Sequence, residues 1–168
     1  MQAQVLMEEE DAQEGRYLTF GVAGEIYGIE IRYVTEIVGL QPITGIPEMP
    51  DYVKGIINLR GKVFPVIDMR IRFLKNSAAY TDRTCIIVVE LQDVTVGFIV
   101  DKVEEVLSIG KENVAPPPDQ KTGADSRNVK GIGKTANGII LLLDCEKVLR
   151  DGGVDAENER SNKIEKVK

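Results

Sequence analysis

One tetrapeptide, Val-Lys-Gly-Ile, occurs twice in this chain, at 53–56 and at 129–132, and each copy opens the same pattern. An apolar run leads to a polar turn, a second apolar run follows, and Asp68 or Asp144 ends the pattern. Two apolar runs around a short polar turn are typical of a β-hairpin, and in the first copy Gly61 supplies a residue that tolerates positive φ. A repeat of this length predicts two similar modules in one chain.

The remaining segments repeat in the same order around these hairpins. Each half offers two short apolar runs, one helical turn, a third run, a proline-rich connection, the hairpin and a short helical piece. Five short strands per half with little helix indicate small closed barrels rather than a sheet of βαβ units. We therefore expect a mainly β fold, with two five-stranded β-barrels packed together, short helices and a C-terminal helix.

The expected domain boundaries follow from this order and from the polar ends of the chain. They are 1–14 for a disordered acidic N-terminus, 15–80 for the first barrel module, 81–150 for the second module with its terminal helix, and 151–168 for a polar tail. The sequence does not decide whether the modules exchange strands, and such an exchange would change the boundary near 76–83.

Composition and charge exclude several classes of protein. The 168 residues are enough to bury about 70% of the unfolded surface in a core. The net charge of −6 argues against nucleic acid and against anionic membrane surfaces as partners. The acidic stretch Glu8 to Asp11 has the wrong charge for a secretory signal. We therefore expect a cytoplasmic protein in which Cys85 and Cys145 are reduced residues in or near the core.

Four carboxylates follow apolar runs and allow two interpretations. Glu30, Asp68, Asp101 and Asp144 could form a metal-binding or acid–base cluster, or each could accept backbone N–H groups at a helix start. Their regular placement across the repeat favours the second interpretation. The chain contains no histidine, so nucleophilic catalysis lacks its usual base and common zinc sites lack a ligand. We expect no enzyme activity, no metal site and no cofactor.

Arg60, Glu36 and Val34 are the candidate contact residues. Arg60 lies at a hairpin tip, where it is either a solvated turn residue or an interface residue, since the planar guanidinium is favoured at interfaces. Val34 lies on the short turn before Glu36 and is either a core residue or a small apolar contact beside these charges.

The combined pattern resembles the CheW family of bacterial chemotaxis coupling proteins over about 17–150. The residues that carry the resemblance are Tyr27 to Ile31, Val34, Glu36-Ile37, Val53 to Ile56, Asn58 to Gly61, Pro65 to Asp68, Gly97, Val100-Asp101 and Gly131 to Gly133. The resemblance implies that both barrels are SH3-like and that the protein is a free-standing adaptor without catalysis.

The resemblance also implies partners and contact residues. Such proteins bind the regulatory domain of the histidine kinase CheA and the cytoplasmic tips of chemoreceptors. We expect a monomer when isolated, with no direct membrane contact, recruited to receptor arrays at the inner face of the cytoplasmic membrane. The family's contacts map by position to Val34, Glu36, Gly55, Arg60 and Gly61, with Glu36 and Arg60 close enough to pair.

Two other functions compete with this one. A small β-barrel that binds nucleic acid would need a basic groove with stacking aromatics, whereas aromatic residues are only 5% of this acidic chain. A metal-dependent hydrolase would need the recurrent aspartates to converge, which their helix-start placement argues against.

The sequence predicts that the chain neither binds nor hydrolyses ATP, although Gly133-Lys134-Thr135 matches the end of a phosphate-binding loop. Asn128 stands where that motif needs its first glycine, and the strand-like run Ile139 to Leu143 follows where it needs a helix N-terminus. Calorimetry with Mg-ATP is expected to show no saturable heat. Saturable micromolar binding that Lys134→Ala abolishes would contradict this.

Overall fold

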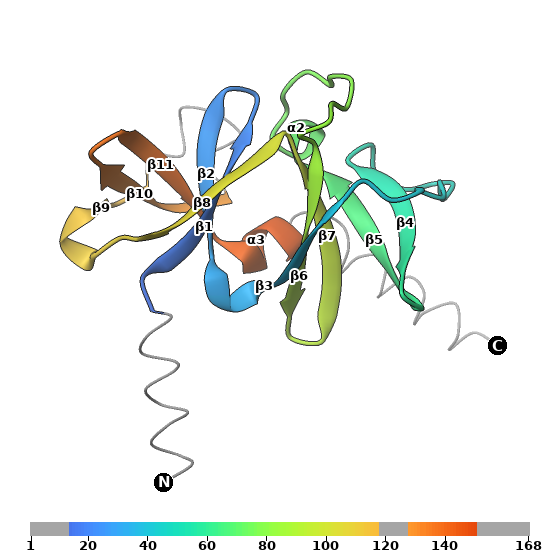
Figure 1. Ribbon diagram of the computed structural model, residues 1–168, viewed down its shortest axis with the longest axis horizontal. Helices are drawn as coiled ribbons and strands as arrows, with labels where there is room; N and C mark the ends of the chain where they lie inside the picture. The colour runs from blue at the N-terminus through green and yellow to red at the C-terminus, as the bar shows by residue number, and fades with distance from the viewer. Residues whose placement is uncertain (1–13, 118–127, 151–168) are drawn as a thin grey trace, which may run out of the picture.

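The computed structural model describes residues 14–117 and 128–150, which form two β-sheets with short helices beside them (Figure 1). The predicted mainly β class with two packed barrel-like sheets is confirmed. In these ranges no helix has the length and apolar character needed to span a bilayer. The predicted ends of the chain, 1–14 and 151–168, lie outside the described residues except for Glu14.

Sheet A has six strands in the order β8-β1-β2-β11-β10-β9, and sheet B has five in the order β3-β6-β7-β5-β4. The strands of sheet A are β1 (Arg16–Val22), β2 (Glu25–Glu30), β8 (Lys102–Ser108), β9 (Val114–Ala115), β10 (Val129–Thr135) and β11 (Gly138–Leu143). Those of sheet B are β3 (Val34–Gly39), β4 (Val53–Leu59), β5 (Lys62–Asp68), β6 (Cys85–Leu91) and β7 (Val94–Val100). The helices are α2 (Met69–Arg72), α3 (Cys145–Arg150) and single 3-10 turns at Ile31–Tyr33 and Lys111–Asn113.

The two halves of the chain exchange their first hairpins. β5 pairs in parallel with β7, and β11 pairs in parallel with β2, so the β6–β7 hairpin joins strands of the first half and the β1–β2 hairpin joins strands of the second. The chain crosses between the sheets from β2 to β3 and again from β7 to β8. The predicted boundary between 15–80 and 81–150 therefore does not coincide with the sheets, because each sheet contains strands from both segments.

The two Val-Lys-Gly-Ile hairpins are equivalent, as predicted. β4–β5 and β10–β11 each turn through two residues, and each shows a register irregularity at the same place, between Val53 and Gly55 or between Val129 and Gly131. An aspartate and a short helix, α2 or α3, follow each hairpin. Gly133-Lys134-Thr135 ends β10 and the strand β11 follows it, so the expected strand stands where a phosphate-binding loop needs a helix.

The largest hydrophobic cluster takes side chains from both sheets and from α3. Its centre includes a ring stack in which Tyr27 of β2 faces Phe73, just after α2, with ring centroids 4.6 Å apart. Because this cluster is shared, the two sheets form one body rather than two independent modules. Cys145 is buried and Cys85 is half-buried, and both are free, which confirms the predicted reduced thiols.

The capping prediction for the four carboxylates is confirmed for two of them. Asp68 accepts a hydrogen bond from the Arg70 N–H at 3.0 Å, at the start of α2. Asp144 likewise accepts one from the Lys147 N–H at 3.2 Å, in the first turn of α3.

The prediction is wrong for Glu30 and Asp101. Glu30 precedes a 3-10 turn but caps it with no side-chain hydrogen bond, and its carboxylate lies 3.2 Å from the Lys130 ammonium instead. The chain continues from Asp101 directly into β8, so there is no helix for this residue to cap.

Asp101 instead connects three separate segments. Its carboxylate accepts two hydrogen bonds from the Arg70 guanidinium on α2, at 2.8 and 2.7 Å, and one from the Ala23 N–H in the β1–β2 turn, at 2.9 Å. Burial raises the pKa of Asp101, but the hydrogen bonds from Arg70 and Ala23 outweigh it and hold the pKa below its ordinary value. The ionised carboxylate therefore links the β1–β2 turn of sheet A to α2, which follows the last strand of the first half in sheet B.

Asp101→Asn is expected to lower the free energy of unfolding at neutral pH by about 1 kcal/mol, a figure reduced for partial exposure. Because the folded-state pKa is depressed, the contribution is complete above the unfolded-state pKa and is lost as pH falls through the folded-state pKa. Urea denaturation should show a constant difference between wild type and variant from about pH 7 to 5, which shrinks as pH falls below the ordinary carboxyl pKa of about 4 and disappears once the folded-state carboxyl is protonated. A difference that persists unchanged in acid would contradict this.

Candidate partner-binding surface

The tip of the β4–β5 hairpin is a two-residue turn in which both residues have positive φ. Arg60 has φ 52° and Gly61 has φ 90°, the combination that matches the twist of a tight hairpin. The Asn58 side chain accepts a hydrogen bond from the Gly61 N–H at 2.9 Å and fixes the turn. The Arg60 side chain on this turn is 68% exposed.

The Arg60 guanidinium pairs with the Glu36 carboxylate on β3, as predicted. The Arg60 Nη2 donates a hydrogen bond to each oxygen of the Glu36 carboxylate. The bond to Oε2 is 2.6 Å long. This hydrogen bond and the adjacent negative charge raise the pKa of Arg60 above its ordinary value. The pair joins the hairpin tip to the edge strand β3, 24 residues away in sequence.

A shallow cavity of about 330 Å³ lies beside this pair. Phe64 and Val88 supply apolar side chains, while Glu36, Arg60 and Lys62 supply charges. The other lining residues are Thr35, Leu59, Glu90 and Thr95. A small cavity of mixed polar and apolar lining beside fixed charges can take up a side chain of a partner protein and orient it.

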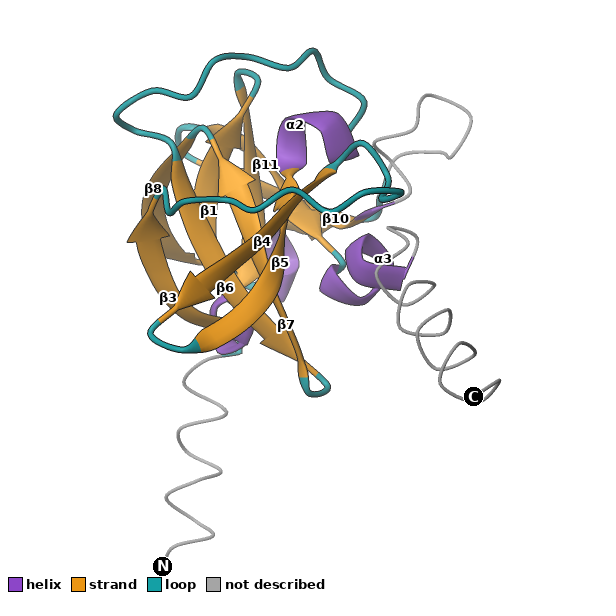
Figure 2. Cartoon of the chain, turned by 90° about the vertical axis from the view of Figure 1, so that its right-hand side faces the viewer, coloured by secondary structure: helices purple, strands orange, loops and turns teal. Residues whose placement is uncertain are grey.

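Val34 and Gly55 differ from the simple contact residues that the sequence predicted. Val34 is half-buried and packs against the shared core, so it is a core residue with only part of its surface available. Gly55 is buried with φ 150°, and a Cβ there would lie 2.1 Å from the Thr44 carbonyl oxygen. Thr44 and Ile56 exchange two backbone hydrogen bonds at 2.9 Å, so the connection 40–52 passes close beside β4 (Figure 2). The missing side chain of Gly55 leaves room for this approach.

Gly61 belongs to this surface, whereas Ile37 lies on the opposite face of β3 from Glu36, because successive side chains of a strand alternate. A Cβ on Gly61 would meet no atom within 4 Å, so its function is the turn conformation alone. Ile37 was not predicted, yet it lies next to Glu36 on β3 and is 44% exposed. The alternation of half-buried and exposed residues along β3 is the signal that could have identified it.

The described residues contain no group of three or more histidine, cysteine, aspartate or glutamate side chains placed to hold a metal ion. The surface offers contact chemistry: a fixed ion pair, a small cavity of mixed polar and apolar lining, and exposed apolar side chains.

Comparison with known proteins gives consistent results. The family model described as CheW-like domain matches residues 16–152. The chain is 36% identical over 133 residues to Chemotaxis protein CheW of Klebsiella aerogenes, covering 79% of this chain and 80% of that protein. It is 33% identical over 144 residues to Chemotaxis protein CheW of Helicobacter pylori, covering 85% of this chain and 86% of that protein. The crystal structure of the scaffolding protein TtCheW from Thermoanaerobacter tengcongensis has a TM-score of 0.75 and 38% identity, covering 81% of this chain and 92% of that one.

Gly55→Ala is expected to lower the free energy of unfolding by about 2–3 kcal/mol, because the new Cβ would force Thr44 away and strain the backbone. Gly61→Ala is the matched control. It introduces the same methyl group at positive φ but into open space, and should cost only about 1–2 kcal/mol. Urea denaturation of both variants measures the difference. Equal losses would show that the Thr44 contact does not restrict Gly55.

Proposed function

The chain belongs to the CheW-like domain family of non-enzymatic chemotaxis scaffolds, and from this premise we propose that it couples chemoreceptor tips to the regulatory domain of the histidine kinase CheA. The observation that carries the proposal is the Arg60–Glu36 pair beside the cavity on sheet B. A guanidinium held on a rigid turn is prepared for binding, since little side-chain entropy remains to be lost.

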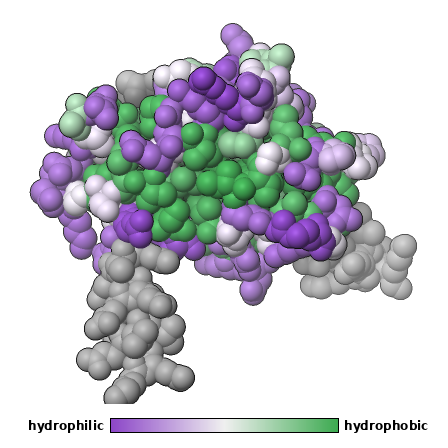
Figure 3. Space-filling view, viewed as in Figure 1, coloured by the Kyte–Doolittle hydropathy of each residue, from purple (hydrophilic) through white to green (hydrophobic). Residues whose placement is uncertain are grey.

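An apolar band supports the proposal that a receptor tip binds here. Figure 3 shows apolar surface, bordered by polar side chains, across the face where β8, β1 and β3 lie in Figure 1. Ile37 on β3 and Val106 on β8 are 44% and 41% exposed. An amphipathic receptor helix binds through an apolar face of this kind. This activity would place the protein in the cytoplasm, at receptor arrays on the inner face of the membrane.

The nucleic-acid alternative gains no support from this geometry. The described cavity neutralises its arginine with a glutamate, and its one aromatic ring, Phe64, is 3% exposed and so cannot stack with a base.

Glu36→Ala and Arg60→Ala are expected to weaken binding of the CheA regulatory domain, of a receptor cytoplasmic fragment, or of both, by roughly tenfold or more. The melting temperature should stay within a few degrees, because an exposed ion pair contributes little to stability. Titration of each variant against each partner, beside thermal melting, measures both effects. The double variant should be no weaker than the worse single one if the pair acts as a unit.

Arg83→Ala is the matched control, because Arg83 is also an exposed arginine but lies before β6, at the opposite end of that strand from the cavity residue Glu90. It should bind both partners normally. If Glu36→Ala and Arg60→Ala also bind normally, or fail only because they unfold, the surface is assigned wrongly.

A further inference from the structure

The site on sheet B has a counterpart on sheet A, because the repeat aligns residue by residue. In sheet B, β3 pairs with β6 through Val34 with Val89 and Ile37 with Ile87. In sheet A, β8 pairs with β1 in the same way, and the pairs are Val103 with Phe20 and Val106 with Leu18. Both ladders contain an irregularity between these pairs. Counting along the strands therefore makes Glu105 the counterpart of Glu36.

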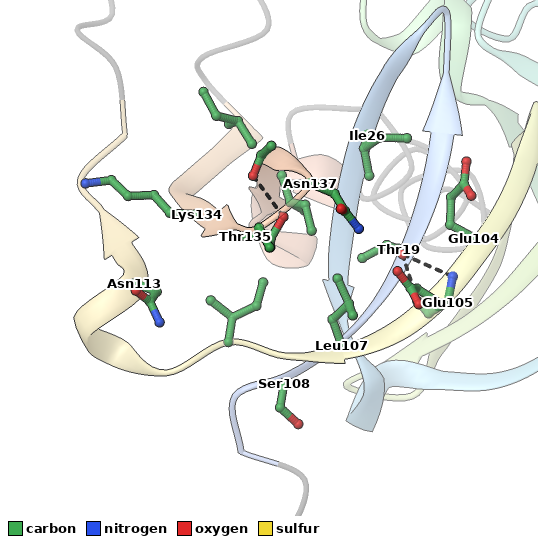
Figure 4. A pocket seen from close by; sticks show the side chains of 15 residues that line it. Thr19, Ile26, Glu104, Glu105, Leu107, Ser108, Asn113, Lys134, Thr135 and Asn137 are labelled. Atoms are coloured by element: carbon green, nitrogen blue, oxygen red, sulfur yellow. Dashed lines mark hydrogen bonds between the residues drawn. The ribbon is translucent and has the colours of Figure 1, made fainter.

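A cavity lies at the corresponding place in sheet A (Figure 4). Its volume is about 530 Å³, against about 330 Å³ for the one in sheet B. It lies between β8 and the tip of the β10–β11 hairpin, as the first cavity lies between β3 and the tip of β4–β5. Its lining includes Glu104, Glu105, Leu107, Lys134, Asn137 and Ile140.

The two cavities differ at the position that supplies the cation. The residue that aligns with Arg60 in the second hairpin is Ala136. Among the described residues, no ion pair involves the Glu105 carboxylate, whereas Glu104 pairs with Lys102 at 2.8 Å. Lys134 also lines this cavity, but in Figure 4 its side chain extends away from Glu105.

The backbone of Glu105 is fixed by Thr19, whereas its side chain is exposed and its charge is unpaired among the described residues. Thr19 donates to the Glu105 carbonyl oxygen at 2.7 Å and accepts from the Glu105 N–H at 3.1 Å. Figure 4 shows the Asn137 amide directed from the hairpin toward the side of the cavity where Thr19 and Glu105 lie. The apolar side chains of Leu107 and Ile140 can cover the methylene groups of a long side chain.

The edge of sheet A beside this cavity is open. β8 is the terminal strand and pairs only with β1 among the described strands. Most of its residues are exposed. An unpaired strand edge can accept a further strand of another chain through backbone hydrogen bonds. A hairpin alongside β8 would therefore deliver its tip residue to the cavity.

We propose that this cavity binds an arginine at the tip of a β-hairpin of a different protein, whose guanidinium pairs with Glu105 as Arg60 pairs with Glu36. The partner supplies in trans the cation that the first barrel supplies in cis. A second copy of this chain is the poorer occupant, because its own Arg60 is already paired. The proposed site lies on sheet A, beside Val106 of the apolar band, whereas the Arg60–Glu36 pair lies on sheet B, and the proposal does not depend on that pair.

The test uses the full chain and a disulfide-cyclised hairpin peptide with Leu-Arg-Gly-Lys at its tip. The peptide should bind saturably by fluorescence anisotropy, and replacing its arginine by citrulline, a neutral group of the same shape, should weaken binding about tenfold. Glu105→Gln should have the same effect. Ala136→Arg should abolish binding by filling the site in cis, without lowering the melting temperature.

Glu104→Gln is the matched control, because it removes the same charge from the neighbouring residue and should leave binding unchanged. Equal binding of the arginine and citrulline peptides, equal effects of the two glutamine variants, or no binding at all would overturn the proposal. Concentration-dependent self-association that both Glu105→Gln and Arg60→Ala abolish would assign the cavity to a second copy and also overturn it.

Discussion

Two parallel strand pairs, β5 with β7 and β11 with β2, are the contacts on which the rest of this structure depends. Each brings together strands from opposite halves of the chain and has a glycine at the crossing. Gly97 is the partner of Val66, and a Cβ on Gly97 would lie 2.9 Å from a Val66 methyl group. Gly28 is the partner of Leu142, and a Cβ there would lie 3.2 Å from a Leu142 methyl group. These crossings make one shared core from two barrels.

The exchange of hairpins also builds the surfaces. β3 and β8 each follow a crossing between sheets and end as edge strands, so each carries a glutamate to the open side of a barrel. In sheet B the hairpin tip supplies an arginine to that glutamate, and the site is complete within the chain. In sheet A the tip carries Ala136, and the same geometry leaves a carboxylate without its cation. The two cavities occupy equivalent places in the repeat, and they differ in whether the chain itself supplies the cation.

The sequence identified the local features because their causes are local. The two hairpins follow from apolar alternation around a turn, and Gly61 follows from the positive φ that the turn requires. The Glu36–Arg60 pair was expected from family resemblance rather than from spacing. Asp101 was misassigned because an acidic residue after a strand is typical of a helix cap, whereas its partner Arg70 lies 31 residues away. Gly55 was expected as a contact residue from the family resemblance alone, and its packing against Thr44 was not expected because that approach leaves no mark in the sequence around it.

The sequence by itself therefore determined the strands, the repeated hairpins and the two turn residues, since short-range backbone preferences and apolar periodicity act within a few residues. Only the tertiary structure decided which hairpin joins which sheet. Each half contains the same series of strands, so pairing within a half and pairing across halves satisfy the same local pattern. The choice is made by packing between distant segments, through Gly97, the Arg70–Asp101 contact and the shared core. These contacts exist only once the chain has folded.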